Sequence, residues 1–240
     1  MQMTEGTVVL SKVDEHGVGT SNIPLQARTF GRDPAWRARA LWWWVLLSAT
    51  TVGFYSMRYA LPNPPWILTQ IKNNFLFPHE LSIHAIAGSI ALLVGPWQLS
   101  ASLRTAHPRV HRWLGRIYVA DVLVAWLLAI FLIPTVTTGF LAASAFFIAG
   151  VLWIGFAILG VLAILRRDIQ AHRRYMLRSY AMALTAVTIR YYYVPARALG
   201  IPFEYNYPAS LWLAILTNIA VIEVVLRWPQ MRAAFIRPPV

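Results

Sequence analysis

The sequence predicts an all-α, polytopic membrane protein with six transmembrane helices, and two observations carry this prediction. Six apolar stretches are each long enough, at about 1.5 Å per helical residue, to cross about 30 Å of hydrocarbon. Arg and Lys residues fall almost entirely in alternate linkers between these stretches, as they do in multi-pass proteins. Hydrophobic residues make up 58% of the 240-residue chain and charged residues only 12%, which excludes an ordinary soluble domain.

The predicted helices are separated by polar or helix-breaking residues. The first opens with Trp42, Trp43 and Trp44, whose amphipathic rings favour the headgroup level, and Pro62 follows its end. The six predicted helices span residues 40–61, 80–100, 114–133, 140–165, 176–198 and 208–228.

The charge asymmetry of the linkers predicts the orientation. Cytoplasmic loops retain Arg and Lys, and 17 of the 21 such residues lie on the side that both termini share. We therefore expect a cytoplasmic polar tail (1–38), a transmembrane domain (39–230) and a short cytoplasmic C-terminal tail (231–240). The basic residues on the opposite side are Arg58, Lys72, Arg190 and Arg197.

Composition and missing motifs exclude several classes of function. The sequence has no Cys, which excludes disulfides, thiolate catalysis, iron–sulfur clusters and covalently attached haem. It also has no phosphate-binding glycine loop, HExxH, GxSxG or dinucleotide fingerprint. The net charge of +12 comes from Arg at helix ends, so the lipid bilayer rather than nucleic acid is the expected partner.

Two parts of the chain resemble each other. The tripeptide Ile-Ala-Gly occurs at 86–88 and again at 148–150, and the motifs HRx3RxY and HRx4RxY begin at His111 and His172. These repeats predict that the second to fifth helices form a four-helix bundle of two tandem hairpins. Chance similarity between two Arg-rich helix starts is the alternative.

Some ionisable residues fall inside the predicted helices, where each costs about 2.5–3.5 kcal/mol on insertion scales. One explanation is a proton-linked path, and the other is local neutralisation. Arg116 or Arg178 is the expected partner of the buried aspartate, and Arg227 that of the buried glutamate. The ionisable residues concerned are Asp121, Glu223, Arg190 and His84.

The two repeat-related histidines, His111 and His172, begin the third and fifth predicted helices at matching depth. In an up-down bundle these helices occupy diagonal corners, which suits two axial imidazoles that ligate one b-type haem. Contacts with lipid phosphates, loop capping or a partner protein are the alternative roles. The guanidinium groups expected to pair with haem propionates belong to Arg112, Arg116, Arg173 and Arg178.

A second site is predicted in the half of the membrane away from this pair, at His84 and Arg190. There the His84 imidazole is expected to hydrogen-bond a quinone carbonyl, to serve a second electron site as the single ligand of a haem, or to pair with Tyr191, Tyr192 and Tyr193. In the proposed repeat the position equivalent to His84 is occupied by Phe146, so a second haem with two histidine ligands is not expected.

The motifs HPxxHRxxGRxY, from His107 to Tyr118, and HRRxMxRSY, from His172 to Tyr180, resemble those of a bacterial family of predicted membrane proteins, domain of unknown function 2306. The resemblance covers about residues 81–197 and implies a polytopic helical protein of a bacterial inner membrane. The layout is also similar, in architecture and histidine placement, to haem-carrying four-helix membrane cytochromes and ferric reductase-like domains.

These observations favour a membrane electron-transfer module that binds b-type haem, with a quinone site as a second component. A non-catalytic accessory subunit of a larger membrane complex is the alternative, because eleven Trp and a basic cytoplasmic face suit a scaffold with one partner surface. A proton-linked transporter is the third hypothesis. Enzymatic activity is not decided by the sequence.

Overall fold

The computed structural model describes residues 35–61 and 78–236, and these are helical apart from short turns. No strand occurs within those ranges. The chain divides into two compact units, Met1–Ala38 and Arg39–Val240. Most of the predicted N-terminal tail (1–38) lies outside the described residues, as does the end of the C-terminal tail (231–240).

The helices agree with the expected all-α class and are longer than predicted at several ends. Helix α5 begins at Pro108, where proline suits the first turn because its missing N–H is not needed there. The described elements are α1 (Ala35–Met57), η1 (Arg58–Ala60), α3 (Pro78–Leu99), α4 (Ala101–Ala106), α5 (Pro108–Leu132), η2 (Ile133–Thr135), α6 (Phe140–Leu165), α7 (Ile169–Ala183), α8 (Thr185–Ala198) and α9 (Phe203–Ile236).

Four helices within the described ranges are long and apolar enough to cross a membrane. They cover His79–Leu99, Pro108–Thr135, Phe140–Leu165 and Phe203–Arg227. Helix α1 is not among them, because its tryptophans and its Ser and Thr residues lower its hydropathy. The predicted fifth span is not among them either, because it is divided into α7 and α8, whose 15 and 14 residues are each too few for a single crossing helix.

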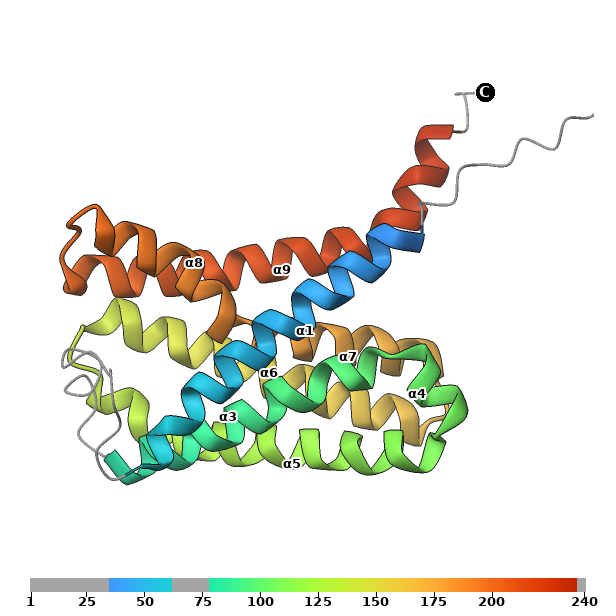
Figure 1. Cartoon of the computed structure of the whole chain (residues 1–240), viewed down its shortest axis with the longest axis horizontal. Helices are drawn as coiled ribbons and strands as arrows, with labels where there is room; N and C mark the ends of the chain where they lie inside the picture. Colours follow the sequence, from blue (N-terminus) through green and yellow to red (C-terminus); the bar gives the residue numbers. More distant parts are fainter. Residues whose placement is uncertain (1–34, 62–77, 237–240) are drawn as a thin grey trace, which may run out of the picture. The chain divides into compact units, whose positions relative to one another are not determined.

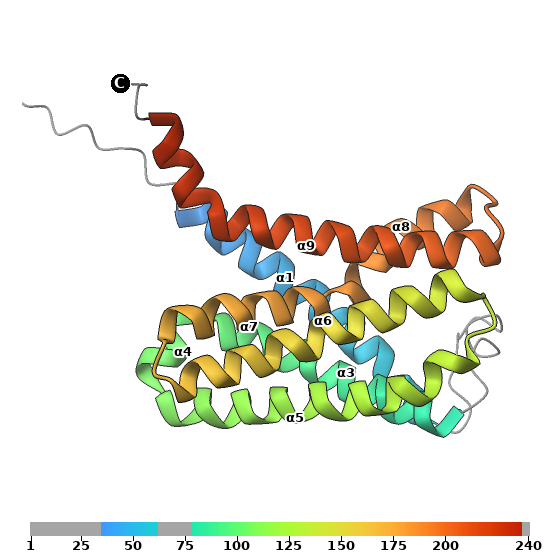
Figure 2. The same cartoon turned by 180° about the vertical axis from the view of Figure 1, so that it is seen from behind.

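Four helices contact one another in a closed ring. Helix α3 packs against α5, α5 against α6, α6 against α7, and α7 against α3. Figures 1 and 2 show these helices side by side, with α4 at one end of them and α8 beside α9 toward the other. We call these the α4 end and the α8 end. Helices α5 and α7 are not adjacent in this ring, so they occupy diagonal positions.

The predicted continuous helix 176–198 is interrupted at Leu184, which ends α7 and precedes α8. The carbonyls in the last turn of a helix lack a donor from their own helix and need another one. Asn218 of α9 supplies it, because its Nδ2 donates to the Ala181 carbonyl at 2.9 Å. Its Oδ1 accepts a hydrogen bond of 2.9 Å from the hydroxyl of Thr188. Helix α9 therefore stabilises the break.

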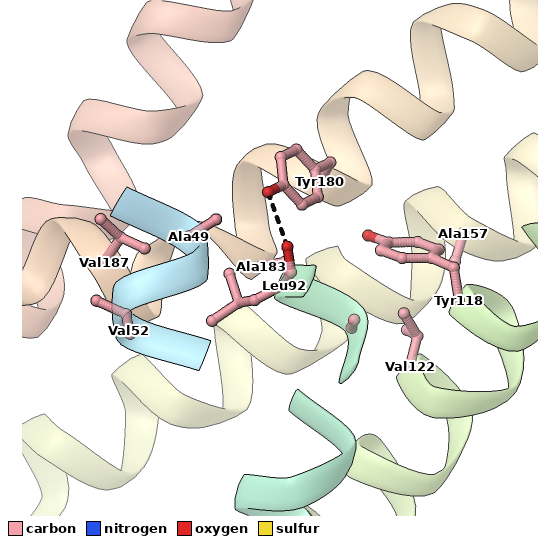
Figure 3. Close-up of a cluster of buried hydrophobic side chains, with 10 residues drawn as sticks. Ala49, Val52, Leu92, Tyr118, Val122, Ala157, Tyr180, Ala183 and Val187 are labelled. Atoms are coloured by element: carbon pink, nitrogen blue, oxygen red, sulfur yellow. Dashed lines mark hydrogen bonds between the residues drawn. The ribbon is translucent and has the colours of Figure 1, made fainter. Parts of the chain in front are cut away.

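A proline in α3 explains a long-range contact in the core. Pro96 has no N–H, so the Leu92 carbonyl four residues earlier loses its usual helical donor. The hydroxyl of Tyr180 in α7 donates to that carbonyl at 3.2 Å, as Figure 3 shows. The Tyr180 ring lies directly on Gly95, where a side chain would collide with it.

The repeat-related tyrosines Tyr118 and Tyr180 meet in this core, with ring centroids 6.4 Å apart. Both are almost fully buried, and α1 contributes Ala49 and Val52 to the same apolar cluster (Figure 3). The equivalent positions of the two motifs are therefore neighbours in space.

We expect Gly95→Ala to lower the free energy of unfolding by about 1–3 kcal/mol, as overpacking does in other cores. The reason is that the new Cβ would lie 1.9 Å from a Tyr180 ring carbon. Thermal unfolding in detergent, followed by circular dichroism, measures the change. The control is Gly155→Ala, because no residue beyond the neighbouring backbone of its own helix lies within 4 Å of the added Cβ there. Equal losses in the two variants would contradict this packing.

Candidate functional site

Helices α5 and α7 present matching faces to each other. The Tyr118 hydroxyl and the Ser179 Oγ are hydrogen-bonded at 2.9 Å. His111 and His172 each lie seven residues earlier, which is two turns along the same helix face. Both helices begin at the α4 end (Figures 1 and 2). The two histidines therefore lie on facing sides, about 10 Å nearer the α4 end than the tyrosine–serine contact.

The two imidazoles differ in their hydrogen bonds. The Nδ1 of His172 is 2.8 Å from the Gly160 carbonyl. Because a carbonyl only accepts, this nitrogen carries the proton and Nε2 keeps its lone pair. The Nδ1 of His111 is buried without a partner. The two rings are close enough for their charges to interact. No group of three or more His, Cys, Asp or Glu side chains that could hold a metal ion occurs among the described residues. His111 and His172 therefore have no third metal-binding side chain beside them.

Three of the four arginines predicted to flank the histidines are exposed, and the fourth is paired. Arg112, Arg116 and Arg173 are exposed at the α4 end, where Arg116 lies over the Trp113 ring at 5.2 Å. Arg178 lies deeper in α7, and the structure joins it to α9.

Glu223 is the carboxylate that neutralises Arg178. The Arg178 Nε donates to Glu223 Oε1 at 2.6 Å, and its Nη2 donates to Oε2 at 3.1 Å. Arg227, one turn further along α9, pairs with the same carboxylate at 3.3 Å. Asp121, by contrast, pairs with neither Arg116 nor Arg178, and its Oδ2 is buried without a partner.

A cavity of about 270 Å³ lies toward the α8 end, lined by residues of α1, η1, η2 and every helix from α3 to α9 except α4. Its walls are mainly apolar or aromatic. Polar side chains on its lining include His84, Arg190, Tyr59 and Tyr207.

The two residues predicted to share a second site, His84 and Arg190, thus line one cavity. The Nδ1 of His84 donates to the Ala125 carbonyl at 2.9 Å, which leaves Nε2 with its lone pair. The guanidinium of Arg190 donates to the Ala186 carbonyl in its own helix. No carboxylate is among the lining residues.

A tryptophan connects the cavity to the facing side chains of α5 and α7. Trp153 lines the cavity, and its Nε1 donates to the Tyr118 hydroxyl at 3.2 Å. The Ser179 hydroxyl lies 3.3 Å from the Trp153 carbonyl. These three side chains form a polar link between the cavity and the helix faces that carry His111 and His172.

Several residues of this arrangement are not predicted by the sequence. Trp153 and Tyr207 line the cavity, but nothing in their spacing distinguishes them from other aromatic residues of apolar helices. The sequence identifies Arg58 only as one of the four basic residues on the side opposite the termini. The linker 62–77 that follows Arg58 contains no Asp or Glu. This lack of a nearby acidic residue is the one feature of the sequence that distinguishes Arg58.

Comparison with known proteins agrees with the membrane character of the fold. A family model described as "Predicted membrane protein (DUF2306)" matches residues 81–226. No curated protein and no solved structure matches the chain.

We expect Glu223→Gln to lower stability by about 1 kcal/mol, since it leaves Arg178 without a charged partner at a partly buried site. Thermal unfolding in detergent measures this loss. The control is Glu204→Gln, because this exposed glutamate forms no ion pair with a described residue. The double variant Arg178→Gln/Glu223→Gln should lose less than the sum of the single changes. Strict additivity would argue against the ion pair.

Proposed function

Because the chain belongs to the DUF2306 family of predicted membrane proteins, it is a membrane protein, and we propose that it is an electron-transfer module that holds one b-type haem between α5 and α7. His111 and His172 are the proposed axial ligands. The observation that carries the proposal is the Tyr118–Ser179 contact, because it aligns the helix faces on which both histidines lie.

The hydrogen bond of His172 supports a ligand role. Histidines that bind a metal usually donate their other ring N–H to a carbonyl or carboxylate, which fixes the tautomer. His172 donates from Nδ1 to Gly160 and so keeps Nε2 available. His111 has a buried Nδ1 without a partner, an unsatisfied group that a ligand at this site would explain.

The surrounding charges suit the propionate groups of a haem. Arg112, Arg116 and Arg173 lie at the same end as the histidines and form no ion pair with a described residue. Guanidinium groups bind carboxylates through paired hydrogen bonds. In this proposal Arg178 positions α7, because Glu223 already occupies its donors. A bound haem would supply a reversible one-electron couple.

The proposal includes six membrane crossings. Helices α7 and α8 together would form the fifth crossing, with its break inside the protein, where Asn218 satisfies the freed carbonyl. Helix α1 would form the first crossing. The closed ring of α3, α5, α6 and α7 supports a four-helix bundle. The Arg-rich α4 end, and with it both termini, would face the cytoplasm of a bacterium.

A quinone head group is the second component of the proposal. The cavity at the α8 end would receive it, because His84 and Arg190 both line that cavity. Trp153 and Tyr118 would then lie between the quinone and the haem.

The haem is tested by spectroscopy of the full-length protein, expressed with ample haem and purified in detergent. We expect a Soret band that shifts and sharpens when dithionite reduces the sample. His111→Ala and His172→Ala should each abolish the band of the six-coordinate form. The control is His107→Ala, because His107 is exposed at the same end of the fold and should leave the spectrum unchanged.

A flat Soret region in the folded wild-type protein would end the haem proposal. Co-purification of a stoichiometric partner chain without a chromophore would then favour the accessory-subunit hypothesis.

A further inference from the structure

Two arginines at the α8 end share one aromatic ring. The guanidinium carbon of Arg58 lies 3.3 Å from the centroid of the Tyr55 ring, and that of Arg190 lies 5.6 Å from it. The Nε and Nη1 atoms of Arg58 are buried without a hydrogen-bond partner. The two cations are close enough to repel each other. Arg190 lines the cavity, and Arg58, although not a lining residue itself, lies next to the lining residue Tyr59 in the chain.

No described carboxylate compensates these charges. Glu80 and Glu204 lie at the same end, but neither forms an ion pair with Arg58 or Arg190. The linker 62–77 has no acidic residue to offer either. The α4 end differs, because Glu223 there neutralises Arg178. Partly buried charges without a counter-charge are costly in a low-dielectric region, and they mark ligand sites in membrane proteins.

The cavity limits the size and polarity of a ligand. At about 270 Å³ it lies near the lower limit of small-molecule pockets. Its aromatic and apolar walls include Trp126, Trp153 and Phe146. Its polar lining residues include His84, Tyr59 and Arg190. This combination suits a flat apolar body of one or two rings that carries a single polar head.

From the charges and the cavity together we infer that this site binds its ligand as an anion, an organic acid with an apolar body whose negative head lies at Arg190 and Arg58. The inference refines the quinone part of the proposed function and shares only the cavity with it. A neutral quinone would leave both cations uncompensated, whereas a carboxylate or an ionised hydroxyquinone would neutralise them. Guanidinium groups favour such anions through charge-assisted hydrogen bonds.

The test compares probes of equal shape and different charge. Naphthoate and its neutral methyl ester are titrated into the full-length protein in detergent by isothermal calorimetry, with empty micelles as the blank. We expect naphthoate to bind at least about tenfold more tightly, which corresponds to the loss of one charge-assisted hydrogen bond. Equal affinities, or tighter binding of the ester or of the neutral quinone menadione, would overturn the inference.

Variants assign the binding to the two arginines. Arg190→Gln and Arg58→Gln should each weaken naphthoate binding by about tenfold or more and leave the ester unaffected. Arg190→Lys should retain part of the affinity, because it keeps the charge but loses the fork of donors. The matched control is Arg197→Gln, an exposed arginine of α8, which should bind like the wild type. The same loss in Arg197→Gln would indicate a nonspecific charge effect and refute the site.

Two further measurements separate the remaining possibilities. Competition by the fatty acid laurate would identify a lipid-derived acid as the ligand class, and its failure would identify a ring acid. The Soret band of the same preparation reports the haem independently. Naphthoate binding without that band would leave the anion site intact and refute the haem, and the reverse result would refute only the anion site.

Discussion

Inside an apolar protein core, every backbone carbonyl that a helix cannot satisfy must find a donor from within the protein, because little water is there to supply one. Two carbonyls of this chain lack a donor from their own helix. One is that of Leu92, four residues before Pro96, and the other is that of Ala181, just before the helix break at Leu184. Tyr180 and Asn218 provide the missing donors from neighbouring helices. The two contacts tie α7 to α3 on one side and to α9 on the other. The position of α7 and of the side chains it carries follows from them.

The buried contacts of Tyr118 and Tyr180 connect the position of α7 to the geometry of the two candidate sites. Tyr180 sits on Gly95 and meets Tyr118, its counterpart in the repeat. Tyr118 in turn contacts Ser179 and Trp153. One buried group of side chains therefore sets the register of α5 against α7 and forms part of the path toward the cavity. A change in this core would alter the histidine pair and the cavity together.

The two ends of the molecule differ in the exposure and ion pairing of their arginines. At the α4 end the arginines are exposed or, like Arg178, paired with a carboxylate. At the α8 end Arg58 and Arg190 are partly buried beside a cavity and have no described acidic partner. Exposed and paired charges are inexpensive, whereas unpaired buried charges are not. The cost at the α8 end is consistent with a site whose compensation comes from a ligand.

Sequence alone determined the all-α class, most helix positions, the clustering of Arg on alternate linkers, and the placement of His84 and Arg190 in the same half of the molecule. These properties follow from hydropathy, charge and spacing, which are local. Tertiary structure decided the break at Leu184, the pairing of Arg178 with Glu223, the unpaired Asp121, and the approach of Arg58 to Arg190 around Tyr55. Each depends on contacts between helices that are distant in the chain. The periodicity of a single helix shows which of its faces is buried, but it does not show which other helix packs against that face.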